Sequence, residues 1–121
     1  MVKIKKSTLE SICEAARNTY PDEFIALIGS KRYGVIDDLV VLPATFGENF
    51  SSIRIDLAPF DDSIVGSVHS HPGKSARPSG ADLRVFKRTG KTHLIIAHPF
   101  SLENARAFAR NGEELELKVV E

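Results

Sequence analysis

The chain has 121 residues, of which 42% are hydrophobic and 26% are charged, and its formal net charge is zero. This length supports one domain, residues 1–121, and the balanced charge argues against a nucleic-acid binder. The single cysteine, Cys13, excludes an intramolecular disulfide and favours a reducing compartment. No apolar run approaches the roughly 20 residues that span a bilayer, and the N-terminus lacks a signal-peptide pattern. We therefore expect a cytoplasmic protein with no membrane or nucleic-acid partner.

The chain begins with the pattern of a short strand followed by an amphipathic helix. Val2 and Ile4 alternate with lysines, and Ser7-Thr8-Leu9-Glu10 matches a capping box for a helix that ends before Pro21. Apolar residues follow at the spacing i, i+3, i+4 and i+7: Leu9, Ile12, Cys13 and Ala16. Because Cys13 lies on this stripe, it is predicted to be a small buried hydrophobe and not a nucleophile.

Four strands are predicted in the middle of the chain. Residues 23–29 are apolar nearly throughout, which indicates a strand buried on both faces, and residues 35–42 form the next strand. Residues 52–57 alternate apolar with polar side chains, as in a half-exposed strand. Residues 63–68 are mostly apolar and predict a short buried strand that ends at His69.

The last third continues with a helix over residues 80–88, a buried strand over 92–97 and a hairpin. The hairpin strands, 104–110 and 113–120, flank Asn111-Gly112, a strong turn signal. The element order β-α-β-β-β-β-α-β-β-β predicts an α/β (α+β) three-layer sandwich, in which a mixed, curved sheet is flanked by two helices.

Two histidines near the last buried strand do not form a metal pair. His93 and His98 are five residues apart, so in a strand they point to opposite faces and cannot chelate one ion locally. We interpret both as ordinary strand-end histidines.

The clearest chemistry lies in His69-Ser70-His71-Pro72, followed by Ser79 and Asp82. Residues two apart in a strand point the same way, so His69 and His71 can aim their imidazoles at one point while the serine between them faces away. Asp82 falls in the first turn of the following predicted helix. Two imidazoles and one carboxylate make a three-ligand site, which is how proteins hold catalytic zinc and leave one position for water.

Each half of this pattern also has a structural explanation. An H-x-H pair can be two ordinary strand histidines. Ser79 and Asp82 match a capping box in which Asp82 also opposes the helix dipole. The combination within a strand, loop and helix favours the metal site.

Glu23 adds a further acidic group at the start of the predicted strand 23–29. A carboxylate at the mouth of an apolar strand is most simply an exposed strand end. Next to a zinc-bound water, it could instead be the general base that takes the proton and returns it to the leaving amine.

Together these residues resemble the signature of the JAMM (MPN-plus, JAB1/MPN/Mov34) family of zinc metallopeptidases, an upstream Glu followed by H-x-H-x7-S-x2-D. The signature falls on Glu23, His69, His71, Ser79 and Asp82 with no departure in spacing. The resemblance covers essentially the whole chain, and it is strongest to the minimal archaeal members, which remove ubiquitin-like modifiers from proteins. It implies a JAMM/MPN-like (cytidine-deaminase-like) sandwich, which agrees with the predicted element order.

The resemblance also implies an activity. The enzyme would be a zinc-dependent isopeptidase, deubiquitinase-like or desampylase-like, that cuts between the Gly-Gly C-terminus of a ubiquitin-like modifier and a target lysine. His69, His71 and Asp82 would hold one Zn²⁺ per chain. Glu23 would be the general base, and Ser79 would donate its hydroxyl to the oxyanion. The expected partners are a ubiquitin-like small modifier protein and its conjugates, and a homodimer stays open.

The segment 74–91 is locally basic although the whole chain is neutral. Its basic residues are Lys74, Arg77, Arg84, Lys87, Arg88 and Lys91, and its only acid is the proposed ligand Asp82. A solvated helix face explains this pattern as well as an attractive surface for an acidic modifier does.

The resemblance further implies that the Gly-Gly tail enters extended and pairs with a strand edge, as in β-augmentation. Strand 52–57 is our candidate edge, and the loop 73–78 would close the opposite wall. Arg54, Lys74 and Arg77 are the candidate substrate-binding residues at these two walls.

Two other functions stay open at this point. A peptidase that processes the C-terminus of a ubiquitin-like sulfur-carrier protein would meet the same kind of substrate, a ubiquitin-like fold with a slender tail. A non-catalytic MPN scaffold belongs to a different class, and the intact five-residue signature argues against it.

Overall fold

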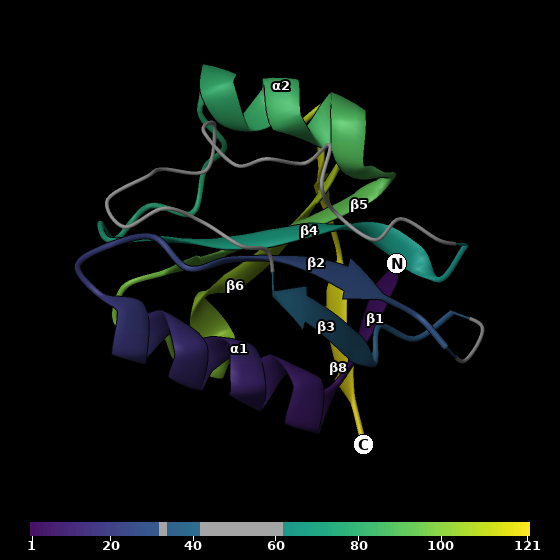
Figure 1. Ribbon diagram of the computed structural model, residues 1–121, viewed down its shortest axis with the longest axis horizontal. Coiled ribbons are helices and arrows are strands. Elements are labelled where there is room, and N and C mark those ends of the chain that lie inside the picture. Colours follow the sequence, from purple (N-terminus) through teal and green to yellow (C-terminus); the bar gives the residue numbers. More distant parts are fainter. Residues whose placement is uncertain (32–33, 42–61) are drawn as a thin grey trace.

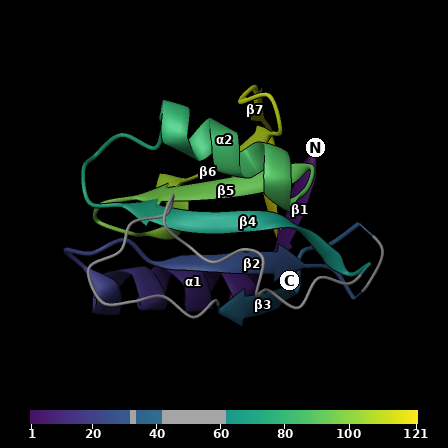
Figure 2. The ribbon, with the colours of Figure 1, turned by 45° about the horizontal axis from the view of Figure 1, so that its top comes forward.

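A central β-sheet with a helix on each face organises the described part of the protein, residues 1–31, 34–41 and 62–121 of a computed structural model (Figure 1). The strands in this part are β1 Val2–Lys5, β2 Ile25–Gly29, β3 Asp38–Val41, β4 Ile64–His71, β5 Thr92–Ala97, β6 Ala105–Ala109, β7 Glu114–Leu115 and β8 Leu117–Val120. The helices are α1 Lys6–Thr19, α2 Gly80–Thr89 and the short 3-10 helix η3 Leu102–Asn104. Figure 2 shows α1 and α2 on opposite sides of the sheet, which confirms the predicted three-layer sandwich.

The main sheet of the described residues has the strand order β3-β2-β4-β5-β6-β7. Its central strands β4 and β5 are parallel, and α2 forms the crossover that a parallel pair requires. The other neighbouring strands in this order are antiparallel. Since His71 lies opposite Ala97, β4 and β5 end at the same edge of the sheet.

Side-chain alternation in the central strands separates the core into two layers. On one face, Ile28 and Val68 pack with the buried stripe of α1. On the other face, Leu27 packs with Phe86 of α2. Because successive strand residues point to opposite faces, a Val68 that faces α1 places His69 on the α2 side.

Helix α1 buries the predicted apolar stripe, together with Thr8. Burial raises the pKa of the Cys13 thiol, which fits a core residue and not a nucleophile. The predicted capping box at Ser7 is wrong, because the helix already begins at Lys6 and Lys5 makes no side-chain cap. Strand β1 stays paired with β8 as far as Lys5, so the chain passes directly from strand into helix.

The C-terminal hairpin is shorter than predicted. Strand β7 pairs with β6, with Leu115 opposite Ala107, but β8 then leaves and pairs in parallel with β1 in a separate two-stranded sheet of the described residues. Between β7 and β8, the Glu116 carbonyl accepts the Val2 N–H at 2.8 Å. Alternation of apolar and polar residues looks the same whichever strand β8 pairs with, so the sequence did not reveal that β8 pairs with β1.

The other predicted elements hold with shifted ends. Strand β2 begins at Ile25 instead of residue 23, and β3 occupies part of the predicted range 35–42. Helix α2 and strand β5 match their predicted ranges to within one residue. The predicted strand 52–57, with Arg54, lies outside the described residues. In the part of the chain that is described, neither α1 nor α2 has the length and apolar character needed to cross a membrane.

Close contact between β4 and β5 depends on two glycines. Gly66 lies opposite Thr92, and a Cβ added at Gly66 would collide with the Thr92 carbonyl oxygen. Gly90 joins α2 to β5 with a φ of +133°, and a Cβ there would collide with the Val65 carbonyl oxygen. The two glycines allow the crossover to return tightly onto β4, the strand that carries both motif histidines.

Gly66→Ala is expected to lower the free energy of unfolding by about 3 kcal/mol or more, because the added methyl group meets the backbone of the neighbouring strand. Urea unfolding followed by circular dichroism measures the change. Gly73→Ala is the matched control, since a Cβ at Gly73 meets nothing within 4 Å, and it should shift stability by no more than about 0.5 kcal/mol. Equal stability of the two variants would contradict the tight β4–β5 contact.

Candidate metal centre

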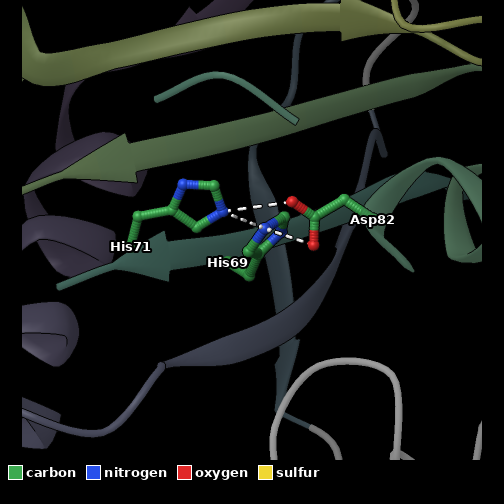
Figure 3. A group of neighbouring side chains, drawn as sticks. All are labelled: His69, His71 and Asp82. Atoms are coloured by element: carbon green, nitrogen blue, oxygen red, sulfur yellow. Dashed lines mark hydrogen bonds and ion pairs between the residues drawn. The ribbon is translucent and has the colours of Figure 1, made fainter. Parts of the chain in front are cut away.

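Two histidines at the end of β4 face each other on the α2 side of the sheet. The His69 side chain is fully buried and that of His71 is 17% exposed. Their Nε2 atoms lie 3.0 Å apart. Figure 3 shows both imidazoles turned toward Asp82. Strand alternation therefore brings the H-x-H pair to one point, as predicted.

Asp82 reaches this point from the first turn of α2. Its Oδ2 accepts the Ser79 N–H at 2.8 Å, and Ser79 Oγ accepts the Asp82 N–H at 3.1 Å, which is the predicted capping box. The same carboxylate places Oδ2 at 3.1 Å from His71 Nε2 and Oδ1 at 3.2 Å from His69 Nε2. Asp82 thus caps the helix and contacts both imidazoles.

These atoms form a donor set that fits a zinc ion. One ligand atom each from His69, His71 and Asp82 lies within 4.8 Å of the others. Ligands bound at about 2.0–2.1 Å to a tetrahedral zinc lie about 3.3 Å apart, close to the separations found here. His71 Nδ1 donates to the Ser75 carbonyl at 3.0 Å, an outer contact of the kind that orients ligating imidazoles. The cluster can therefore hold a metal ion with three protein ligands.

The electrostatics of the cluster favour a cation. Burial by itself would raise the pKa of Asp82, but hydrogen bonds from His69 and His71 outweigh it and hold that pKa well below its usual range. Burial would likewise lower the pKa of His71, but its hydrogen bonds to Asp82 and to the Ser75 carbonyl raise it. At neutral pH, Asp82 is therefore a buried carboxylate that attracts positive charge.

Glu23 lies just before β2, the strand that pairs with β4. Ile25 stands opposite His69 in the antiparallel ladder, so the chain that leads into β2 lies at the same sheet edge as His71. Ile25 packs on the α2 side, and alternation indicates the same side for Glu23. The negative charge of Glu23 also contributes, as the smallest of several causes, to raising the pKa of His71.

The other predicted site residues that the structure describes, Ser79, Lys74 and Arg77, are exposed. Ser79 is exposed at the N-terminus of α2 beside Asp82. Lys74 and Arg77 are exposed in the loop after β4, and with Ser75 they line a hollow of about 300 Å³. Arg54 lies outside the described residues, so the structure does not relate it to this loop.

As predicted, His93 and His98 take no part in the three-residue cluster, but the environment of His93 in β5 is more specific than that of an ordinary strand-end histidine. His93 is fully buried, and its ring stacks on Phe86 with centroids 4.1 Å apart. Its Nε2 donates to the Gly90 carbonyl at 2.9 Å, so Nδ1 accepts the Ser67 hydroxyl at 2.8 Å. His98 is half-buried in contact with the rings of Tyr20 and Phe100.

Ser70 is the residue whose contact the sequence did not reveal. It is buried, and as predicted it lies on the opposite face of β4 from the two histidines. Its Oγ accepts the Phe24 N–H at 2.8 Å, next to Glu23. A serine between two histidines carries no local signal for a partner 46 residues away.

Sequence comparisons place the chain in a family. The family model described as prokaryotic homologs of the JAB domain matches residues 5–111. A curated relative from Haloferax volcanii, described as a probable metalloprotease, is 36% identical over 131 residues, which cover all of this chain and 81% of the relative. The chain therefore belongs to the JAB (JAMM/MPN) family, as its five-residue signature indicated.

Solved structures share the fold of this chain. A structure described as a JAMM metalloprotease-like zinc site in the proteasome and signalosome is 39% identical, with a TM-score of 0.80 over 100% of this chain and 99% of that one. A JAB1/MPN domain protein from Archaeoglobus fulgidus is 38% identical, with a TM-score of 0.79 over 100% of this chain and 98% of that one. A protein from Desulfitobacterium hafniense, 24% identical with a TM-score of 0.73 over 100% of this chain and 94% of that one, shares the fold.

The buried His93 predicts a loss of stability in mild acid. Burial lowers its pKa to about 4, below the ordinary value of 6.5. Between these pH values the unfolded chain binds a proton that the folded protein excludes, so the free energy of unfolding falls as the pH drops through this window, by about 2–3 kcal/mol at pH 4.5. Above pH 6.5 this contribution is fully present.

Urea unfolding of chelator-treated protein at pH 7 and pH 4.5 measures this loss. His93→Gln is the comparison, because its amide can still donate to the Gly90 carbonyl but does not titrate. The difference between the two pH values should be smaller in the variant, since all other titrating groups are shared. An unchanged difference would show that His93 is not the source.

Proposed function

We propose that this protein is a zinc-dependent metallopeptidase that acts as an isopeptidase, releasing a ubiquitin-like modifier from a lysine side chain. The observation that carries the proposal is the convergence of His69, His71 and Asp82 on one point, with Glu23 preceding β2 at the same edge of the sheet. The probable metalloprotease from H. volcanii and the metalloprotease-like zinc site of the similar structure support this choice of metal and reaction.

The donor set assigns the metal and its ligands. His69, His71 and Asp82 would hold one Zn²⁺, which when bound polarises an amide carbonyl and lowers the pKa of a coordinated water from about 15.7 toward 7. The capping box holds the Asp82 carboxylate in place before any ion arrives. The chain therefore supplies a largely formed site.

Glu23 and Ser79 supply the proton and hydrogen-bond chemistry. Glu23 takes the proton of the attacking water and passes it to the amine that leaves, as a general base and then a general acid. Ser79 Oγ accepts the Asp82 N–H, and its own O–H proton can still be donated to the carbonyl oxygen as negative charge develops there. Loss of such a donor typically raises the barrier by about 3–4 kcal/mol.

The recessed ligands favour a slender substrate. His69 is fully buried, and the Asp82 side chain is only 7% exposed, so an ion held there would be reached chiefly from the side of His71, the most exposed of the three ligands. A Gly-Gly tail has no side chains to obstruct this approach, whereas most peptide segments do. We propose that the tail enters extended and that Lys74 and Arg77, exposed in the loop between β4 and α2, contact the globular part of the modifier.

Glu23→Gln is expected to retain about one zinc per chain but to lose turnover by about 10²–10⁴-fold, because the variant removes a proton acceptor and no ligand. Metal analysis and cleavage of a modifier–lysine conjugate measure the two effects. His71→Ala is the matched control and should lose both zinc and activity. A Glu23→Gln protein without zinc would make Glu23 a ligand, and purified wild-type protein that never takes up zinc would favour the scaffold function.

Conjugates whose tail ends in Ala-Ala should be cleaved far more slowly than Gly-Gly conjugates at equal concentration. The added methyl groups obstruct the close approach of the tail to the recessed ligands. Initial rates on the two conjugates, with an unfolded protein as a third substrate, test this selectivity. Equal rates on both tails, or efficient cleavage of the unfolded protein, would instead indicate a general peptidase.

A further inference from the structure

The ladder between β2 and β4 changes its bonding beside the site. Its last regular pair sets Ile25 opposite His69, and Phe24 and Ser70 follow. The Ser70 N–H donates to the Phe24 carbonyl at 2.9 Å, but the Phe24 N–H donates to Ser70 Oγ at 2.8 Å. In a regular antiparallel pair both acceptors are backbone carbonyls. Here a side-chain hydroxyl takes the place of one of them.

The Ser70 hydroxyl holds the backbone of Phe24, the residue that follows Glu23 in the chain. Phe24 and Ser70 are both buried, and the Phe24 side chain packs into the core on the α1 side. Both backbone polar groups of Phe24 are therefore tied to Ser70, one through the N–H of Ser70 and one through its hydroxyl. The orientation of the preceding residue, Glu23, depends on this anchor.

Ser70 lies between the two proposed ligands but on the opposite face of β4, so it cannot act on the metal directly. Its effect on chemistry must pass through Phe24 to Glu23, which precedes β2 at the same sheet edge as His71. We propose that Ser70 is a positioning residue that holds the general base Glu23 over the site. The inference rests on the proposed function, in which Glu23 is that base.

Ser70→Ala tests the inference with Ser67→Ala as the matched control. Ser67 is a buried serine on the same strand whose hydroxyl bonds to His93 and not to the Glu23 segment. We expect Ser70→Ala to keep about one zinc per chain and an unchanged KM while kcat falls about 10–100-fold, as for a misplaced catalytic group. Ser67→Ala should keep the wild-type kcat. Ser70→Thr, which retains the hydroxyl, should restore most of the activity.

Two further measurements separate positioning from a general loss of structure. Amide hydrogen exchange should show that the Phe24 N–H loses protection in Ser70→Ala and keeps it in Ser67→Ala and Ser70→Thr. Adding Ser70→Ala to Glu23→Gln should lower kcat no further, because the base that Ser70 positions has already been replaced. An additional loss in the double variant would overturn the inference.

The failures of the two proposals differ. A zinc-loaded wild-type protein that cleaves no modifier conjugate overturns the proposed function, and the role of Ser70 falls with it. An active wild-type enzyme whose Ser70→Ala variant keeps its kcat, or whose Ser67→Ala variant loses as much, overturns the role of Ser70 alone.

Discussion

The hydrogen bonds of the Asp82 carboxylate connect the two motif histidines to the start of α2. One oxygen accepts the N–H of Ser79 and lies beside His71, and the other lies beside His69. The start of α2, the end of β4 and the proposed metal ligands are thereby joined through a single side chain. A buried carboxylate is costly unless it is hydrogen-bonded and paired, and both conditions are met here. The helix N-terminus adds favourable electrostatics, because its dipole stabilises negative charge.

This arrangement needs a rigid strand beneath it, and β4 is well suited to that role. It is central in the described sheet, antiparallel to β2 on one side and parallel to β5 on the other. Gly66 lets β5 approach closely, and the buried His93 ring fills the space between β5 and α2 by stacking on Phe86. The two histidines therefore project from backbone that is held on both sides, as a preorganised ligand set requires.

The convergence of His69, His71 and Asp82 was predictable from the sequence because its determinants are local. Strand alternation brings His69 and His71 together, and the spacing of Ser79 and Asp82 produces a capping box, so short-range rules were sufficient. Non-local pairings were not predictable in the same way. The alternating pattern of residues 113–120 is the same whether β8 pairs with β7 or with β1, so it did not reveal the pairing with β1. The environment of the buried His93 depends on Phe86 and Ser67, which belong to other elements. The Ser7 cap failed because pairing of β1 extends to Lys5 and moves the helix start.

The proposed base, Glu23, comes from a different part of the chain than the proposed ligands, and this separation has a chemical consequence. His69, His71 and Asp82 belong to β4 and α2, whereas Glu23 precedes β2 and lies at the same sheet edge only because β2 pairs with β4. In the proposed mechanism, metal affinity and proton transfer therefore depend on separate contacts, the first on the capping box and the second on the β2–β4 ladder. A general base must lie within hydrogen-bond reach of the proton it abstracts, so its strand has to end in a defined place. The bond from Phe24 to the Ser70 hydroxyl defines that place with a residue that never faces the metal.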